Sequence, residues 1–111
     1  MSVNMENRTL FTIIKCMDKS GNKPKEMREA LMMEHLSYIE TILDKVLVAG
    51  PIFDDDNKSI IGSLLVYKTD DKAQARSYLE ADPYYTADIW GDISVNVFRG
   101  ALGDAVGGKA Y

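Results

Sequence analysis

The sequence has very little cysteine and no long apolar run, and both shortages exclude classes of protein. Cys16 is the only cysteine among 111 residues, so the chain has no internal disulfide and no CxxC metal or redox pattern. No stretch approaches the roughly 18 apolar residues of a membrane span. Residues 1–8 are polar and have no apolar signal core. We therefore expect a cytoplasmic protein with no metal site and no membrane partner.

Basic charge is also scarce. Thirteen Lys and Arg residues stand against seventeen Asp and Glu residues, which gives a net charge of −4. Nucleic-acid binding is driven largely by Lys and Arg side chains that displace counterions from phosphates. The stretch 60–67 (IIGSLLVY) also lacks the exposed aromatic and basic residues that RNA-binding strands use. Nucleic acid is therefore not an expected partner.

The apolar pattern predicts four strands and two main helices. Residues rich in β-branched and aromatic side chains predict strands over 9–17, 46–53, 60–67 and 90–99. Helical spacing predicts helices over 24–43 and 70–81, with Asp70 as the N-cap of the second, and a short helical turn over 83–89. The order βαββαβ predicts an α+β ferredoxin-like plait. We expect one domain over residues 9–99, a flexible N-terminus over 1–8, and a loose, Gly-rich C-terminal tail over 100–111.

The predicted strands are apolar on both faces, which two helices on one face of a sheet leave partly uncovered. The first strand sets Leu10, Ile14 and Cys16 against Phe11, Ile13 and Met17, and the third sets Ile61 and Leu65 against Leu64 and Val66. An uncovered apolar face needs a partner, and a second copy of the chain is the simplest one. The strand pattern therefore predicts a homodimer that packs sheet against sheet.

His35 is the natural candidate for acid–base chemistry, because imidazole alone has an unperturbed pKa near neutrality. Its spacing from Arg28, Met32 and Ile39 places all four residues along one face of the predicted helix. That face includes the apolar stripe, so we expect His35 near the sheet-facing side. The alternative is a core histidine whose ring nitrogens bond to the backbone.

Asp82 is the second candidate, in the segment Asp82-Pro83-Tyr84. It could accept a hydrogen bond from the imidazole and fix its tautomer. It could also simply cap a helix that has Pro at its first position. Tyr84 and Trp90 lie close by in the sequence and either wall a flat ligand or fill a dimer interface.

Two glycine-containing pairs lie near the ends of predicted strands: Gly50-Pro51 closes the second strand and Gly62-Ser63 opens the third. Glycine inside a strand often marks a bulge or a place where a ligand approaches the backbone. The alternative is hairpin geometry around the Asp-rich turn between these strands. Both interpretations stay open at this point.

These motifs, taken in order, resemble those of the YCII-related (YciI-like) family. The matching segments are 34–39 (EHLSYI), 48–51 (VAGP), 62–63 (GS) and 81–84 (ADPY), within a similarity that covers roughly residues 10–98. The resemblance implies a dimeric α+β barrel with a site where His35 and Asp82 meet. Arg28 looks like the family's helix arginine, whereas Met32 stands where a second arginine is often found.

The resemblance also implies an activity, which we expect to be lyase-, isomerase- or dehalogenase-like, on small cyclic or hydroxylated aromatic compounds and without a cofactor. A fold relative, the muconolactone isomerase type, moves a proton on a lactone. We expect His35 to act as the acid and base, Asp82 to orient it, and Arg28 to hold a carboxylate or phenolate of the substrate.

Further substrate contacts are expected from Ser63 and the backbone around Gly50 and Pro51, with Tyr84 and Trp90 as aromatic walls. The alternative function is a non-catalytic small-molecule binding or sensing module, or a dimerisation scaffold, that uses the same cleft.

Overall fold

The sheet has four antiparallel strands in the order β2-β3-β1-β4 in a computed structural model that describes residues 9–110. The strands are β1 (Leu10–Asp18), β2 (Val46–Phe53), β3 (Ile60–Tyr67) and β4 (Trp90–Arg99). β2, β3 and β4 begin and end where the sequence predicts, and β1 begins and ends one residue later than predicted. The α+β ferredoxin-like plait is confirmed.

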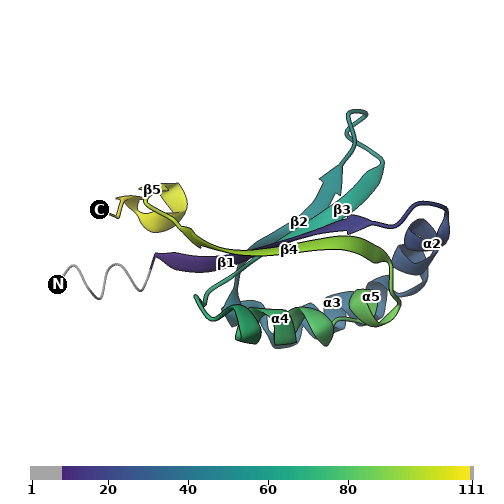
Figure 1. Cartoon of the computed structure of the whole chain (residues 1–111), viewed down its shortest axis with the longest axis horizontal. Coiled ribbons are helices and arrows are strands. Elements are labelled where there is room, and N and C mark those ends of the chain that lie inside the picture. Colours follow the sequence, from purple (N-terminus) through teal and green to yellow (C-terminus); the bar gives the residue numbers. More distant parts are fainter. Residues whose placement is uncertain (1–8, 111) are drawn as a thin grey trace.

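The helices cover one face of this sheet (Figure 1). They are α2 (Lys23–Ala30), α3 (Met32–Thr41), α4 (Lys72–Glu80) and the single turn α5 (Pro83–Thr86). A 3₁₀ turn, η1 (Leu43–Lys45), joins α3 to β2. The cavity described below lies between this helical layer and the sheet.

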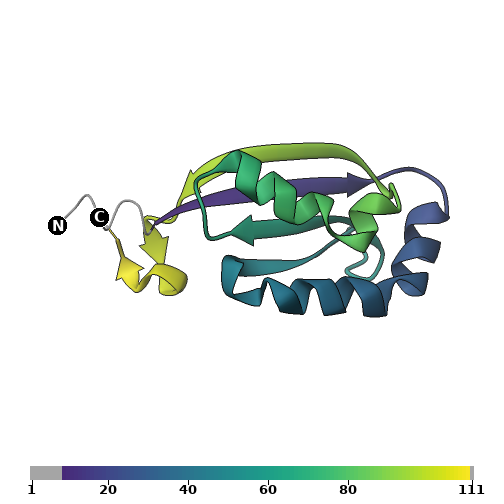
Figure 2. The ribbon, with the colours of Figure 1, turned by 90° about the horizontal axis from the view of Figure 1, so that it is seen from below.

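The single helix predicted over 24–43 is wrong, because the chain bends at Leu31. This residue leaves helical geometry (φ −108°, ψ 10°) and separates α2 from α3, which meet at a clear angle (Figure 2). The apolar spacing continues across the bend, so periodicity alone does not reveal it. The consequence is that side chains of α2 and α3 enter the same cavity from two directions.

The N-cap of α4 is Asp71, whereas the sequence pattern predicted Asp70. Its carboxylate accepts hydrogen bonds from the backbone N–H groups of Ala73 and Gln74, at 3.0 and 3.2 Å. A cap must stand two and three positions before the N–H groups it accepts from, so Asp70 lies one residue too early.

The core fills the space between the sheet and the helices. Its fully buried members include Ile14 of β1, Leu79 of α4 and Ile89, with Leu65 and Tyr67 of β3 packed beside them. Because side chains alternate along a strand, the neighbours of these residues point to the opposite face.

That opposite face is partly apolar, in agreement with the strand pattern. Val48 and Leu64 are 59% and 38% exposed there. On β4 the same face carries Asp92, Ser94 and Asn96, followed by Phe98, which is 47% exposed. The exposed apolar area of this face therefore lies on β2 and β3 and at the end of β4.

The segment after Gly100 forms a small hairpin where the sequence predicted a loose tail. Its strands are β5 (Leu102–Gly103) and β6 (Gly108–Lys109), joined by the 3₁₀ turn η2 (Asp104–Val106). Gly107 closes this turn in the left-handed region (φ 79°), which glycine adopts without steric cost. The expectation of a flexible segment over 1–8 lies outside the described residues.

Candidate active site

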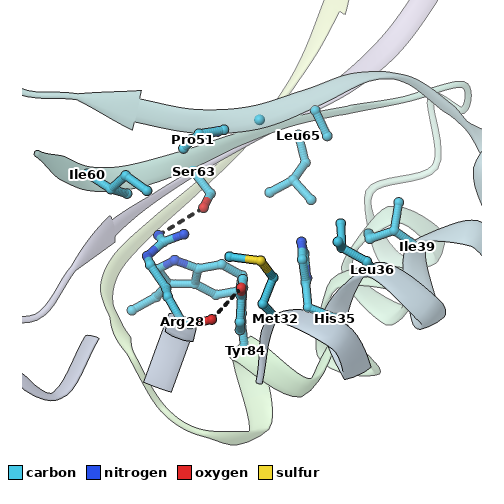
Figure 3. A pocket seen from close by; sticks show the side chains of 13 residues that line it. Arg28, Met32, His35, Leu36, Ile39, Pro51, Ile60, Ser63, Leu65 and Tyr84 are labelled. Carbon is cyan, nitrogen blue, oxygen red and sulfur yellow. Dashed lines mark hydrogen bonds between the residues drawn. The ribbon is translucent and has the colours of Figure 1, made fainter. Parts of the chain in front are cut away.

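A cavity of about 340 Å³ separates α3 from strands β2 and β3 (Figure 3). Most of its lining is aliphatic or aromatic, with a few polar side chains at one end. The lining residues are Arg28, Met32, His35, Leu36, Ile39, Ala49, Gly50, Pro51, Ile60, Ser63, Leu65, Tyr84 and Trp90. An apolar pocket with a few convergent polar groups is the usual form of a small-molecule site.

Asp82 is held behind the cavity wall by the short helix it caps. Its backbone is extended (φ −73°, ψ 133°), and its Oδ1 accepts a hydrogen bond of 2.9 Å from the backbone N–H of Tyr84. Pro83 occupies the first helical turn, where its missing N–H is not needed. The residue is 1% exposed, so the carboxylate must be satisfied by protein groups.

The second group bonded to this carboxylate is His35. Its Nδ1 lies 2.9 Å from both carboxylate oxygens of Asp82. Because a carboxylate only accepts, Nδ1 carries the hydrogen and Nε2 is left with its lone pair. The tip of the ring, which carries Nε2, points across the cavity towards β3 (Figure 3). Asp82 is therefore both the N-cap of α5 and the hydrogen-bond partner of the imidazole, so the geometry agrees with both interpretations of this residue.

Tyr84 fixes the plane of the imidazole. The two rings stack with centroids 4.0 Å apart and an interplanar angle of 10°. The Tyr84 hydroxyl donates a hydrogen bond of 3.0 Å to the backbone carbonyl of Arg28. Burial raises the pKa of Tyr84, partly opposed by the nearby Arg28 charge, so the phenol stays protonated at neutral pH and serves as a rigid wall.

Arg28 does not enter the cavity as a free charge. Its Nη2 and Nε donate to the two carboxylate oxygens of Asp18, at 2.8 and 3.2 Å, and Nη2 also donates to Ser63 Oγ at 3.0 Å. Both charged side chains are about nine-tenths buried. Asp18 was not predicted as a site residue, because it ends β1 just before a turn-rich connector and belongs to no recognisable motif. The expected holder of an anionic substrate group is thus already paired with a carboxylate.

One amino group of Arg28 remains available. Within residues 9–110, Nη1 makes no hydrogen bond, while Nε and Nη2 are both engaged. Ser63 accepts from Arg28 and keeps its own O–H to donate. The polar end of the cavity therefore presents donors to a ligand without a large net charge.

The comparison with known proteins supplies the family. Residues 10–99 match the family model of the YCII-related domain. The chain belongs to the YCII-related family. No curated protein matches this YCII-related chain.

Solved structures similar to this YCII-related protein include named enzymes. One is 5-chloro-2-hydroxyhydroquinone dehydrochlorinase of Burkholderia phenoliruptrix AC1100, in complex with 2,5-dihydroxybenzoquinone, with 26% identity, a TM-score of 0.64, and coverage of 85% of this chain and 96% of that one. SnoaB, a cofactor-independent oxygenase of Streptomyces nogalater, has 12% identity, a TM-score of 0.49, and coverage of 85% and 94%. A dimeric ferredoxin-like protein of Bacteroides fragilis has 12% identity, a TM-score of 0.49, and coverage of 82% and 96%.

The structure of this YCII-related protein brings the expected site residues together. Seven line the cavity directly, namely Arg28, His35, Gly50, Pro51, Ser63, Tyr84 and Trp90. Asp82 stands behind His35. The aliphatic lining from α3, β2 and β3 was not singled out from the sequence, although Met32 and Ile39 share the helical face of His35. Residues from strands carry no such signal, because their facing is set by sheet register.

The two glycines near the site differ in what they allow. A Cβ on Gly62 would stand 2.5 Å from the backbone oxygen of Cys16, so close packing of β3 on β1 requires glycine there. A Cβ on Gly50 would meet no heavy atom within 4 Å. Close packing of β3 on β1, and not the geometry of the β2–β3 hairpin, therefore explains Gly62. Ligand approach is left as an interpretation for Gly50 alone.

A second hollow of about 430 Å³ adjoins the first, with Arg28, Met32 and Ile60 shared between them. Lys25 and Lys58 border it. Glu29 lines the same hollow, so its border carries charges of both signs.

Among residues 9–110, no three His, Cys, Asp or Glu side chains are grouped so that they could hold a metal ion. In the same range, no helix has the length and apolar character needed to cross a membrane. The cytoplasmic location expected from the sequence stays a prediction.

Proposed function

We propose that this YCII-related protein is a cofactor-free enzyme that moves protons on a small, oxygen-bearing ring compound. The observation that carries the proposal is the His35–Asp82 hydrogen bond at 2.9 Å, placed so that Nε2 faces an apolar cavity. A buried carboxylate that holds the imidazole tautomer and stabilises its protonated form is the arrangement of a general base. The fold alone does not specify this chemistry; the site does.

The proposed step is a proton transfer to His35 Nε2 from a ring hydroxyl. The electron pair of the broken O–H bond forms a carbonyl, and Nε2 returns the proton to the ring carbon that bears the leaving group, which becomes tetrahedral. A second ring hydroxyl then gives its proton to Nε2, its electron pair forms a second carbonyl, and the ring double bond shifts as the leaving group departs as an anion with its bonding pair. When no leaving group is present, the reaction stops at the return of the proton to carbon, which gives isomerisation. Asp82 stabilises the imidazolium that forms between these events.

The substrate class follows from the lining. The stacked His35 and Tyr84 rings and the aliphatic wall favour a flat ring, and a cavity of about 340 Å³ suits a small one. Arg28 Nη1 and the Ser63 hydroxyl supply donors for a ring oxygen. The similar dehydrochlorinase supports a hydroxylated and halogenated ring as the first substrate to test.

The test is turnover of chlorinated hydroquinones and catechols, followed by chloride release and by the absorbance of quinone products. We expect His35→Asn to abolish turnover while leaving folding and assembly intact. Ser37→Ala, on an exposed position of the same helix, is the matched control and should keep the full rate. Full activity in His35→Asn would contradict the mechanism. Saturable binding without any conversion would favour the alternative, a binding or sensing module.

We also infer that two copies pack through the exposed side of the sheet. The apolar groups at Val48 and Leu64 lie on the face that no helix covers. A surface of this kind is usually buried against a partner, and a self-complementary sheet face fits a twofold dimer.

A further inference from the structure

Trp90 has a hydrogen-bond donor that the protein leaves unused. Its Nε1 is the one buried side-chain nitrogen or oxygen in residues 9–110 without a hydrogen-bond partner. The side chain is part of the core, 4% exposed, and it also lines the candidate active-site cavity. Buried polar atoms are nearly always paired in native proteins, so each exception calls for an explanation.

The neighbouring groups do not supply an acceptor. The indole N–H only donates. Arg28, at the same cavity, also only donates, and the Tyr84 hydroxyl is already directed at a backbone carbonyl. Asp18 is bonded to Arg28 through both oxygens. No described group accepts a hydrogen bond from Nε1, which leaves this donor available to a molecule bound in the cavity that Trp90 lines.

The indole of Trp90 and the imidazole of the proposed base both contact the ring of Tyr84, but in different orientations. Tyr84 stacks on His35 with one face, while Trp90 meets Tyr84 edge-on, at an interplanar angle of 86° and a centroid distance of 6.3 Å. Arg28 and His35 lie on opposite sides of Tyr84 (Figure 3). Tyr84 therefore stands between the reacting end of the cavity and other groups that can hold a ligand.

We propose that Trp90 is a specificity-determining residue whose Nε1–H donates a hydrogen bond to a carbonyl or phenolic oxygen of the ligand. The inference rests on the proposed function in one respect: the same ligand presents a second group to His35. It narrows the substrate class to rings with at least two oxygen functions, one at the base and one at the indole. A site built to bond an oxygen rejects the analogue without it far more strongly than an apolar pocket can.

Access to Nε1 requires a small shift of a lining side chain. Met32 lines the cavity and is 49% exposed. Its unbranched thioether changes rotamer easily, so it is the residue best suited to make room for the ligand.

The single tryptophan makes a direct test possible, because the chain has one indole N–H resonance. The full chain is labelled with ¹⁵N and titrated with 2,5-dihydroxybenzoquinone and with hydroquinone as oxygen-bearing probes. Chlorobenzene serves as the ring without oxygen. We expect the oxygen-bearing probes to move the indole proton downfield and slow its exchange with solvent, and chlorobenzene to do neither.

The variant Trp90→Phe separates recognition from packing. Removing an unpaired donor while keeping an aromatic ring should leave the thermal midpoint of the free protein unchanged or higher. Affinity for the oxygen-bearing probes should fall about tenfold or more, as expected when one hydrogen bond is lost, and affinity for chlorobenzene should not change. Equal losses for all probes would mean that Trp90 only packs, and would overturn the inference.

Two further outcomes keep this inference distinct from the proposed function. In His35→Asn the indole shift should persist. Wild-type protein that shows the indole shift but converts none of the tested substrates would support the inference while contradicting the proposed enzyme. Binding of 2,5-dihydroxybenzoquinone or hydroquinone that leaves the indole resonance in place would overturn the inference, whatever the activity. Failure of these probes to bind at millimolar concentration would overturn it as well.

Discussion

At the scale of single residues, the site depends on two buried carboxylates that each fix one neighbouring group. Asp82 holds the imidazole of His35, and Asp18 holds the guanidinium of Arg28. For the buried ion pair of Asp18 and Arg28, removing one member leaves the other charge uncompensated, which costs about 3–5 kcal/mol of stability. These carboxylates are therefore structural and functional at once, and only a careful choice of substitution separates the two roles.

For Asp82, substitution by Asn and by Ala should give different results. Asn keeps an oxygen that can accept from the Tyr84 N–H, so the unfolding free energy should change little. It does not stabilise an imidazolium, so the rate should fall by about 10²-fold or more. Ala removes the cap as well, and the cap alone contributes about 1 kcal/mol. Urea denaturation and initial rates on the same preparations measure both effects, and an Asn variant with the wild-type rate would rule out an orienting role.

Cys16 gives the protein a defined sensitivity to alkaline pH. Burial raises the pKa of its thiol from 9.0 to about 12, with smaller opposing effects from Arg76 and Arg28. Above pH 9 the unfolded chain loses this proton while the folded chain keeps it. The unfolding free energy should therefore fall as pH rises from 9 towards 12, by up to about 1.4 kcal/mol per pH unit.

The measurement is urea denaturation at several pH values between about 9 and 10, below the range in which the buried Tyr67, whose pKa is also raised, begins to contribute. Cys16→Ala should be less stable at every pH because of the cavity, but its stability should decline more slowly with pH. Equal slopes in the two proteins would show that Cys16 is not the group responsible. Before unfolding, the native thiol should also resist thiol reagents at neutral pH.

At the scale of elements, the site depends on a bend in the helical layer and on a close approach between two strands. The bend at Leu31 lets Arg28 of α2 and His35 of α3 line one cavity. The close approach of β3 to β1 at Gly62 places the adjoining Ser63 within 3.0 Å of Arg28.

Gly62→Ala should therefore be strongly destabilising. The new Cβ would lie 2.5 Å from the backbone oxygen of Cys16, and a backbone atom cannot move aside as a flexible side chain can. We expect a loss of about 2 kcal/mol or more, at the upper part of the range for overpacking. Gly50→Ala is the matched control: its Cβ meets nothing within 4 Å, and the change should stay within about 0.5 kcal/mol. Similar stabilities for the two variants in urea denaturation would contradict the packing argument.

At the scale of the whole molecule, the uneven distribution of apolar surface is the main feature. One face of the sheet is covered by helices, and the opposite face exposes Val48, Leu64 and Phe98, while the rest of β4 is polar there. At the far end of that face, Val106 of the C-terminal hairpin and the ring of Phe11 both lie close to Gly100. The surface left over is the one through which we expect two chains to meet.

Light scattering coupled to size exclusion should give twice the chain mass of 12.4 kDa at micromolar concentration. Leu64→Asp places a charge on the proposed interface and should shift the protein towards monomer, because burying an unpaired charge is costly. Leu43→Asp is the control, since Leu43 is 63% exposed but lies in η1, away from the sheet. A wild-type mass of about 12 kDa would contradict the dimer.

The sequence by itself determined the four main strands and the order in which strands and helical segments follow one another. The alternation in β4, the β-branched content of β1 and the helical spacing around His35 depend on local periodicity, which a single chain displays directly. The motif order around His35 and Asp82 further indicated which two side chains would meet. Their roles as base and orienting carboxylate stay predictions.

Only the tertiary structure decided the contacts between residues far apart in the chain. The packing of α2, α3 and α5 on the sheet sets the pairing of Asp18 with Arg28, the stacking of Tyr84 on His35 and the unpaired N–H of Trp90. The same packing bends the helix at Leu31 and requires glycine at position 62. Local propensity contains no information on these features, because each one is set by the partner that packing brings close.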